Sequence, residues 1–207
     1  MQRLENKYLI DSELNKNKFL KFIFKNKSYE MHKKRRINSI YFDYPDFRLF
    51  DYSEEGLASR HKIRLRYYGE KYDLNELNIE MKESHAYSKK KYVSNFSDTI
   101  TPTSKNINDA KIMILNKNIK PTIKVSYDRR YFFSDKLGRL TLDENIIYEK
   151  AEWDIFLKKF NFKYKIREPR SVCEHKIENN NPTEEIFEIP NSRFSKYCEG
   201  IKLIYKI

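Results

Sequence analysis

The sequence predicts an α+β fold in which an antiparallel β-sheet dominates and closes into a barrel with a polar interior, with a few peripheral helices. Apolar and polar residues alternate with a period of two in several short segments, the pattern of strands with two different faces. Short connections between these segments favour antiparallel pairing. Many of these strands carry charge on one face, which fits a closed barrel with a polar lumen better than an open sandwich.

The alternating segments predict where the strands lie. They cover residues 3–10, 37–43, 61–68, 77–83, 122–133, 139–143 and 171–177, with a further strand at 185–189. Asp11 and Ser12 can cap a first helix that runs through Phe24.

Further helices are expected between and after these strands. Residues 109–116 and 194–204 are expected to form short helices. An amphipathic helix is expected at residues 153–162, because Trp153, Phe156 and Phe160 recur at helical spacing. Its aromatic residues would then contact the barrel.

Length and charge limit the classes of protein that the chain can represent. The 207 residues are enough for one domain, residues 1–207, with a substantial core. Lys and Arg number 42 against 30 Asp and Glu, a formal net charge of +12. This balance favours an anionic partner, which could be nucleic acid, a membrane surface or a phosphorylated molecule. Only 4 glycines occur, which argues against a glycine-rich phosphate loop.

Cysteine usage and the N-terminus indicate a compartment. Cys173 and Cys198 are too few for a disulfide framework or a zinc cluster, so a reducing environment is expected. The N-terminus is charged at once and lacks the apolar region of a signal peptide. No stretch approaches the roughly 18 apolar residues of a membrane span. We therefore expect a soluble, cytoplasmic protein with no transmembrane segment.

The positions of the charges are more informative than their number. Lys62, Arg64 and Arg66 occupy alternate positions of one segment, so these cations share one face of a strand. A single solvated outer face would give the same pattern. The pattern recurs, however, and other polar faces repeatedly place a glutamate two residues from a cation. These pairs are Glu5 with Lys7, Glu80 with Lys82, and Glu174 with Lys176.

The series of motifs resembles the VTC domain, the polyphosphate polymerase domain of the vacuolar transporter chaperone family, in the triphosphate tunnel metalloenzyme (CYTH-like) superfamily. The opening segment Arg3-x-Glu5-x-Lys7-Tyr-Leu-Ile resembles the first motif of that domain. The later motifs follow in the family's order and cover nearly the whole chain. They are residues 39–43, 62–68, 79–82, 89–91, 121–129, 139–143, 174–176 and 194–197. Each motif alone is weak, but their order and spacing together are specific.

The resemblance implies a tunnel of eight antiparallel strands whose charged side chains point inward. A polyphosphate chain needs several cations, since Arg forks match phosphate oxygens and Lys supplies a mobile point charge. The residues expected to contact the reacting phosphates, and so to be catalytic, are Lys62, Arg64, Arg66, Lys82, Arg129, Arg139 and Lys196. Further phosphate-binding residues are expected at Arg3, Lys7, Lys91, Tyr127, Lys176, Arg193 and Ser195.

The glutamates of the polar faces have two expected roles. They moderate repulsion among the cations, and they can hold Mn²⁺ or Mg²⁺, which prefer carboxylate and phosphate oxygens together. The resemblance implies a metal ligand on the late strand, where Glu174 stands. Glu5 and Glu80 are further candidates, as metal ligands or as salt-bridge partners.

These residue types predict phosphoryl transfer, which depends mainly on positioning and charge neutralisation. The expected partners are ATP, polyphosphate or triphosphate. If the end of a phosphate chain attacks the γ-phosphate of ATP, the enzyme is a polyphosphate polymerase. If water attacks instead, it is a metal-dependent triphosphatase. No residue must act as a general base, which is compatible with an anionic nucleophile.

Two interpretations outside this enzyme class stay open. A non-catalytic module could bind polyphosphate in the same basic tunnel, although Glu174 favours a competent metal site. A nucleic-acid-binding protein would account for the basic charge and for the aromatic residues interleaved with cations at 64–68. Cations that point into a lumen cannot reach a duplex, so no nucleic acid is expected as a partner.

Overall fold

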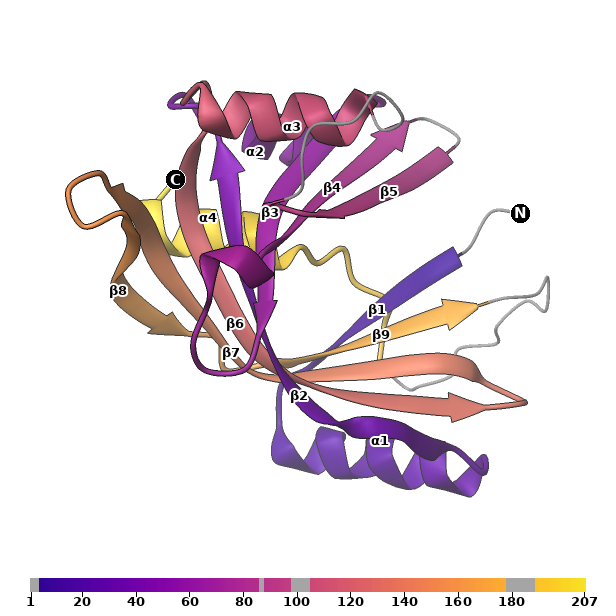
Figure 1. Cartoon of the computed structure of the whole chain (residues 1–207). Helices are drawn as coiled ribbons and strands as arrows, with labels where there is room; N and C mark the ends of the chain where they lie inside the picture. Colours follow the sequence, from indigo (N-terminus) through magenta and orange to yellow (C-terminus); the bar gives the residue numbers. More distant parts are fainter. Residues whose placement is uncertain (1–3, 86–87, 98–104, 178–188) are drawn as a thin grey trace. The chain divides into compact units, whose positions relative to one another are not determined.

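The structure is a computed structural model, and it describes residues 4–85, 88–97, 105–177 and 189–207. Within these residues the chain forms an α+β fold with nine β-strands, mainly antiparallel, and four α-helices (Figure 1). This confirms the predicted α+β class with a dominant antiparallel sheet. The hydrogen-bonded strand order is β1-β9-β7-β6-β2-β3-β4-β5, with β8 paired to β7. This order ends at β1 and β5 in the part of the chain that is described, so closure into a barrel stays a prediction.

The elements follow one another along the chain with mostly short connections. In order they are β1 (Leu4–Ile10), α1 (Glu13–Lys25), β2 (Tyr29–Asp43), α2 (Arg48–Glu54), β3 (Arg60–Tyr68), the 3₁₀ turn η1 (Leu74–Glu76), β4 (Asn78–His85), β5 (Ser88–Asn95), α3 (Lys105–Leu115), β6 (Lys120–Ser134), β7 (Gly138–Asp154), β8 (Lys159–Arg167), β9 (Ser171–Ile177) and α4 (Lys196–Tyr205). None of the helices in the described ranges combines the length and apolarity needed to cross a bilayer.

Contacts within the chain divide it into two compact units. Unit 1 comprises residues 1–36, 127–146 and 167–194, and unit 2 comprises residues 37–126, 147–166 and 195–207. The long strands β2, β6 and β7 contribute residues to both units. That the whole chain is a single domain stays a prediction.

Unit 1 buries one face of its strands beneath α1. Ser12 caps this helix as expected, since its Oγ accepts a hydrogen bond from Asn15 N at 3.2 Å. Phe19 and Ile23 of α1 then pack into an apolar cluster with strand residues that alternate along β1, β6, β7 and β9. These residues are Tyr8, Ile10, Phe132, Leu140, Leu142 and Cys173. The alternation leaves the polar residues of the same strands on the opposite face.

Unit 2 has its own core, built mainly from β2, β3 and β4. Ile63, Leu65 and Tyr67 are buried in it, which confirms the apolar face predicted for that strand. Helix α3 contributes Ile107 and Ala110 to the same core. Lys62, Arg64 and Arg66 therefore lie on the face turned away from this core.

The prediction of a helix at residues 153–162 is wrong, because the segment comprises the end of β7, a turn and the beginning of β8. The carboxylate of Asp154 accepts hydrogen bonds from Phe156 N at 3.0 Å and Leu157 N at 2.9 Å, which closes a turn. Trp153 packs edge-on against Phe160, 4.8 Å between ring centroids, across this hairpin. Helical spacing of aromatic residues therefore also fits two strands that meet across a turn.

The other expected helices are present as α3 and α4. The strand expected at residues 185–189 lies outside the described residues except for its last position. The short helix α2 and the strands β5 and β8 were not predicted.

Candidate functional site

The register of the strands places a band of cations on one face of unit 2. Lys62 lies opposite Lys82, and Lys82 lies opposite Lys91, on three neighbouring strands. Arg64 lies opposite Glu80 on one side and Tyr41 on the other. Directly opposed residues of paired strands share a face. We call this set the basic face: Tyr41, Lys62, Arg64, Arg66, Glu80, Lys82 and Lys91.

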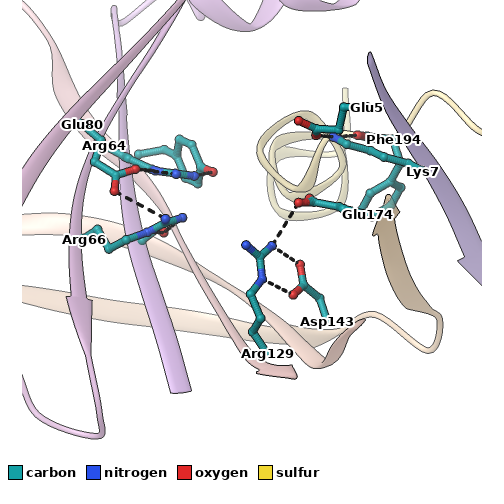
Figure 2. Close-up of polar contacts among 11 residues, drawn as sticks. Glu5, Lys7, Arg64, Arg66, Glu80, Arg129, Asp143, Glu174 and Phe194 are labelled. Atoms are coloured by element: carbon teal, nitrogen blue, oxygen red, sulfur yellow. Dashed lines mark hydrogen bonds and ion pairs between the residues drawn. The ribbon is translucent and has the colours of Figure 1, made fainter. Parts of the chain in front are cut away.

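Glu80 is the carboxylate with which three cations of the basic face form ion pairs (Figure 2). Its Oε2 accepts hydrogen bonds from Arg64 Nε at 2.8 Å and from the Nη2 of the same guanidinium at 2.5 Å. Its Oε1 accepts from Lys91 Nζ at 3.0 Å and from Arg66 Nη1 at 3.4 Å. Burial alone would raise the pKa of Glu80, but the three cations together lower that pKa to about 2. Glu80 is therefore ionised at neutral pH and holds both guanidinium groups in place.

Two further side chains orient the guanidinium groups. Arg66 donates to Ser39 Oγ, with Nε and Nη2 each 3.3 Å away. Arg64 Nη1 donates to the hydroxyl of Tyr41 at 2.8 Å. Burial alone would raise the pKa of Tyr41, but the nearby positive charges, Arg64 first, lower it. The positive charges of the basic face therefore outweigh the opposing effect of burial on this phenol.

Lys62 reaches the beginning of α4. Its Nζ donates to Ser195 Oγ at 2.8 Å and lies 5.7 Å from the ring centroid of Tyr197. Ser195 is the N-cap residue of α4, where its Oγ also accepts from Cys198 N at 3.4 Å. The positive end of the helix dipole repels an ammonium group at the first turn, and a bound anion would offset this repulsion.

Asp43 fixes the position of Tyr197. Its carboxylate is fully buried and accepts backbone hydrogen bonds from Leu49 at 2.9 Å and Phe50 at 3.0 Å in the first turn of α2. It also accepts a hydrogen bond from the Tyr197 hydroxyl. Tyr197 in turn stacks on Tyr41, with 5.0 Å between the ring centroids. Asp43 thus connects α2, α4 and the basic face.

Unit 1 has a second charged face, opposite its apolar core. Lys7 lies opposite Glu174, and Lys176 lies between Glu5 and Arg139 on the neighbouring strands. We call this set the mixed-charge face: Glu5, Lys7, Arg129, Arg139, Thr141, Asp143, Glu174 and Lys176.

Arg129 is the centre of the mixed-charge face (Figure 2). Its Nε and Nη2 bond both carboxylate oxygens of Asp143, at 2.5 and 2.6 Å, in a bidentate pair. Its Nη2 also reaches Glu174 Oε2 at 3.2 Å. Burial would lower the pKa of Arg129, but the carboxylates, Asp143 first, raise it well above its usual value. Arg129 therefore lies on the charged face of unit 1, bound to two carboxylates.

Lys7 and Lys176 occupy the same face with different surroundings. Lys7 Nζ donates to the backbone carbonyl of Phe194 at 2.8 Å and lies 3.8 Å from Glu5 Oε1. The pKa of Lys176 is lowered by burial and by the positive charge of Arg139. The lowered pKa of Lys176 beside another cation indicates a position that an anion would stabilise.

Two polar atoms of the mixed-charge face are buried without a hydrogen-bond partner among the described residues. They are Nε of Arg139 and Oγ1 of Thr141, which stand two residues apart on β7. Buried polar atoms in native proteins are nearly always paired, so each such exception requires an explanation. An anionic ligand on this face would supply an acceptor for both.

The remaining predicted site residues fall in several places. Arg3 lies outside the described residues, and Arg193 is exposed just before α4. Lys82 and Lys91 are exposed at the margin of the basic face, and Lys196 is the first residue of α4. Tyr127 is buried beneath Arg129, whose guanidinium carbon lies 5.3 Å from the ring centroid.

Sequence analysis did not assign Tyr41, Asp43, Thr141, Asp143 and Tyr197 to the site. The alternation at residues 39–43 was a usable signal, because it puts Tyr41 and Asp43 on one face. Tyr197 carries no comparable signal, since its role depends on where α4 packs.

The candidate carboxylates could bind a divalent ion only together with phosphate oxygens, which would supply the other ligands. In the described ranges there is no group of three or more His, Cys, Asp or Glu residues placed to hold a metal ion. Glu80 is held by three cations, which favours its expected role as a salt-bridge partner. Mg²⁺ commonly takes one or two protein carboxylates and completes its shell with phosphate and water. Glu174, with Glu5 on the same face, suits that kind of site.

The chain belongs to the VTC domain family, whose family model matches residues 2–205. This confirms the family that the sequence motifs predicted. Among solved structures, a candidate adenylate cyclase from Vibrio parahaemolyticus is 14% identical, with a TM-score of 0.46 over 99% of this chain and 86% of that one. The PH1012 and PH1819 proteins of Pyrococcus horikoshii OT3 are 12% and 15% identical, with TM-scores of 0.45 and 0.42. They align over 98% and 86% of this chain, and over 87% and 80% of their own. No curated protein matches the chain.

Proposed function

We propose that the protein is a polyphosphate polymerase-type phosphotransferase, which binds ATP and a polyphosphate chain and transfers the γ-phosphate to the chain end. Membership of the VTC domain family supports this assignment. The observation that carries it is the basic face, where Lys62, Arg64 and Arg66 line one side of β3 while Glu80 holds both guanidinium groups in place.

This arrangement suits a chain of phosphates better than a single charge. Successive cations on one strand face are about 7 Å apart, since each residue rises about 3.3 Å. Neighbouring strands repeat such positions at about 4.8 Å. Lys62, Lys82 and Lys91 form such a row across three strands. A linear polyanion could contact several of these positions at once, whereas a monophosphate could contact only one or two.

The proposal includes the closed tunnel of eight strands that the family resemblance implies, with charged faces turned to its interior. Each charged face lies opposite the apolar core of its own unit, which supports this arrangement. Arg139 and Thr141, whose buried Nε and Oγ1 have no hydrogen-bond partner in the described part of the chain, would then face ligand.

The reaction needs no strong base. A terminal oxygen of the chain, already anionic, forms a bond to the γ-phosphorus of ATP as the bond to the β–γ bridging oxygen breaks, and ADP leaves with that electron pair. Lys62, Arg64 and Arg66 would neutralise charge on the transferred group, and Ser195 would orient Lys62. A divalent ion, when bound with Glu174, would neutralise phosphate oxygens.

The test is incubation of the purified protein with ATP and Mn²⁺ or Mg²⁺, with and without a triphosphate primer. Products are resolved on gels for polyphosphate and assayed for free phosphate. Lys62→Met and Glu174→Gln are compared with Lys165→Met, which removes the same charge from an exposed position on β8. We expect long chains from the wild type and from Lys165→Met, and a loss of about 100-fold or more in Lys62→Met.

Other outcomes point to the alternatives. Free phosphate without chains would identify a triphosphatase. If neither product forms but triphosphate raises the melting temperature, the protein is a binding module. If triphosphate does not raise the melting temperature, the assignment of Lys62, Arg64 and Arg66 to a phosphate site is wrong.

A further inference from the structure

An apolar tip stands at the turn between β7 and β8, which extends beyond the ends of both strands (Figure 1). Ile155, Phe156 and Leu157 follow one another in this turn and are 57%, 95% and 61% exposed. Single exposed apolar residues are common on protein surfaces, but three consecutive large ones form a patch that indicates an interaction. We call these three residues the apolar tip.

The apolar tip is held in one conformation by hydrogen bonds. Asp154 Oδ1 accepts from the backbone N–H groups of Phe156 and Leu157, at 3.0 and 2.9 Å. Asp154 Oδ2 accepts from Asn161 Nδ2 at 3.1 Å, across the hairpin. These bonds fix the backbone of the turn in water, so less backbone entropy is lost when a partner covers the apolar tip.

Cations lie directly behind the apolar tip. Lys158 and Lys159 follow it in the sequence and are exposed, and Lys163 stands four residues after Lys159 on β8. The nearby carboxylates are Asp154 and Glu152, and they are outnumbered by Lys150, Lys158, Lys159 and Lys163, of which Lys150 and Lys163 pair with Glu152. The surroundings of the tip therefore favour an anionic partner.

We propose that the apolar tip inserts into the surface of an anionic lipid bilayer, with Lys158 and Lys159 at the level of the headgroups. A stable protein interface covers about 800 Å² on each partner, far more than three side chains on a convex turn can offer. A bilayer surface needs only these side chains to be covered, and lysines near it gain from anionic lipid. Trp153, half exposed beside the tip, belongs to a residue type that favours the membrane–water interface.

The chain contains its own reporter for this proposal. Trp153 is the single tryptophan, so fluorescence excited at a wavelength that tyrosine does not absorb monitors the β7–β8 hairpin alone. The protein is titrated with phosphatidylcholine vesicles, with and without about one third phosphatidylserine, and with brominated lipid as a quencher. We expect a blue shift and bromine quenching with the anionic vesicles, and a much weaker response to phosphatidylcholine alone.

Variants separate insertion from simple attraction of a basic protein to an anionic surface. Phe156→Ser combined with Leu157→Ser should weaken the partition at least about tenfold. Leu14→Ser, which removes an exposed apolar side chain from α1, is the matched control and should bind like the wild type. Lys158→Gln with Lys159→Gln should weaken binding to the phosphatidylserine vesicles specifically. All replaced side chains are exposed, so melting temperatures should not change.

Three results would overturn the proposal. The first is cosedimentation with anionic vesicles without a Trp153 blue shift, which would place the contact elsewhere on the basic surface. The second is undiminished binding of the Phe156 and Leu157 variant. The third is a concentration-dependent dimer that this variant abolishes, with no response to vesicles, which would make the tip an interface between two copies of the chain.

Discussion

Replacing Glu80 by Gln tests whether one carboxylate holds the basic face together. The side chain is only 5% exposed and bonds Arg64, Arg66 and Lys91. The substitution keeps its shape but removes the charge, so it leaves these cations without their common counter-ion. We expect the variant to fold with reduced stability.

The size of the effect follows from two independent estimates. A pKa of about 2 against an ordinary value of 4.5 means that the folded state favours the carboxylate of Glu80 by about 3 kcal/mol. Removing one partner of a buried ion pair typically costs about 3–5 kcal/mol. Lys91 is half exposed, so the lower end is expected, a loss of about 3 kcal/mol at pH 7.

The stability difference also has a predicted pH dependence. Because the pKa of Glu80 is lowered in the folded state, its contribution is present above about pH 4.5 and is lost as the pH falls towards about 2. The difference between wild type and Glu80→Gln should therefore fall to less than half at about pH 3. Urea unfolding followed by circular dichroism at both pH values measures it.

The control is Glu152→Gln, which also removes two ion pairs from a strand of unit 2. Glu152 is 39% exposed and lies 2.9 Å from both Lys150 and Lys163. Exposed pairs contribute little, so we expect a loss below about 1 kcal/mol. The reasoning is refuted if Glu80→Gln is no less stable than Glu152→Gln, or if its deficit is the same at both pH values. Triphosphate should stabilise Glu80→Gln more than the wild type, because the released cations regain an anion.

Three other substitutions test the two cores and the mixed-charge face. Arg129→Ala removes the bidentate partner of the fully buried Asp143 and should cost about 3–5 kcal/mol in urea unfolding; wild-type stability would contradict the bidentate pair. Gly200→Ala puts a Cβ 2.6 Å from Ile123 Cδ1, so it should cost about 1–3 kcal/mol although Ala favours helices; an unchanged melting temperature would exclude this close packing. Burial lowers the pKa of His175. Below about pH 6.5 the unfolded chain therefore binds a proton at this residue that the folded chain does not, and the free energy of unfolding should fall as the pH drops further. His175→Gln should reduce that slope, and identical slopes would show that other groups cause it.

Much of the sheet could be predicted because its strands have one apolar and one charged face. The segment around Lys62, Arg64 and Arg66 is the clearest case, since alternation fixed both the strand and the face that its cations occupy. β5, in contrast, reads Ser-Lys-Lys-Lys-Tyr-Val-Ser-Asn, is exposed along most of its length and lies at one end of the strand order. An edge strand with little buried surface has no strong alternation to detect.

The site was predictable only where local pattern determines it. Arg64 and Glu80 lie opposite each other on paired strands, and the alternation of apolar and polar residues predicts that both are on a polar face. The role of Asp43 depends on α2 beginning directly after it and on α4 reaching it from the other end of the sequence. A side chain that joins segments about 150 residues apart in sequence cannot be recognised from either segment alone.

The pairing of β1 with β9 has a consequence for how the chain folds during synthesis. Leu4 pairs with Ile177, so the first strand has to wait until its partner has left the ribosome. Unit 2 is completed later still, because its buried residues include Ile201 and Gly200 lies in close contact with Ile123. At about 5–20 residues per second the delay is roughly 10–30 s. Early segments therefore emerge with unpaired strand edges, and folding of this topology is expected to be slow.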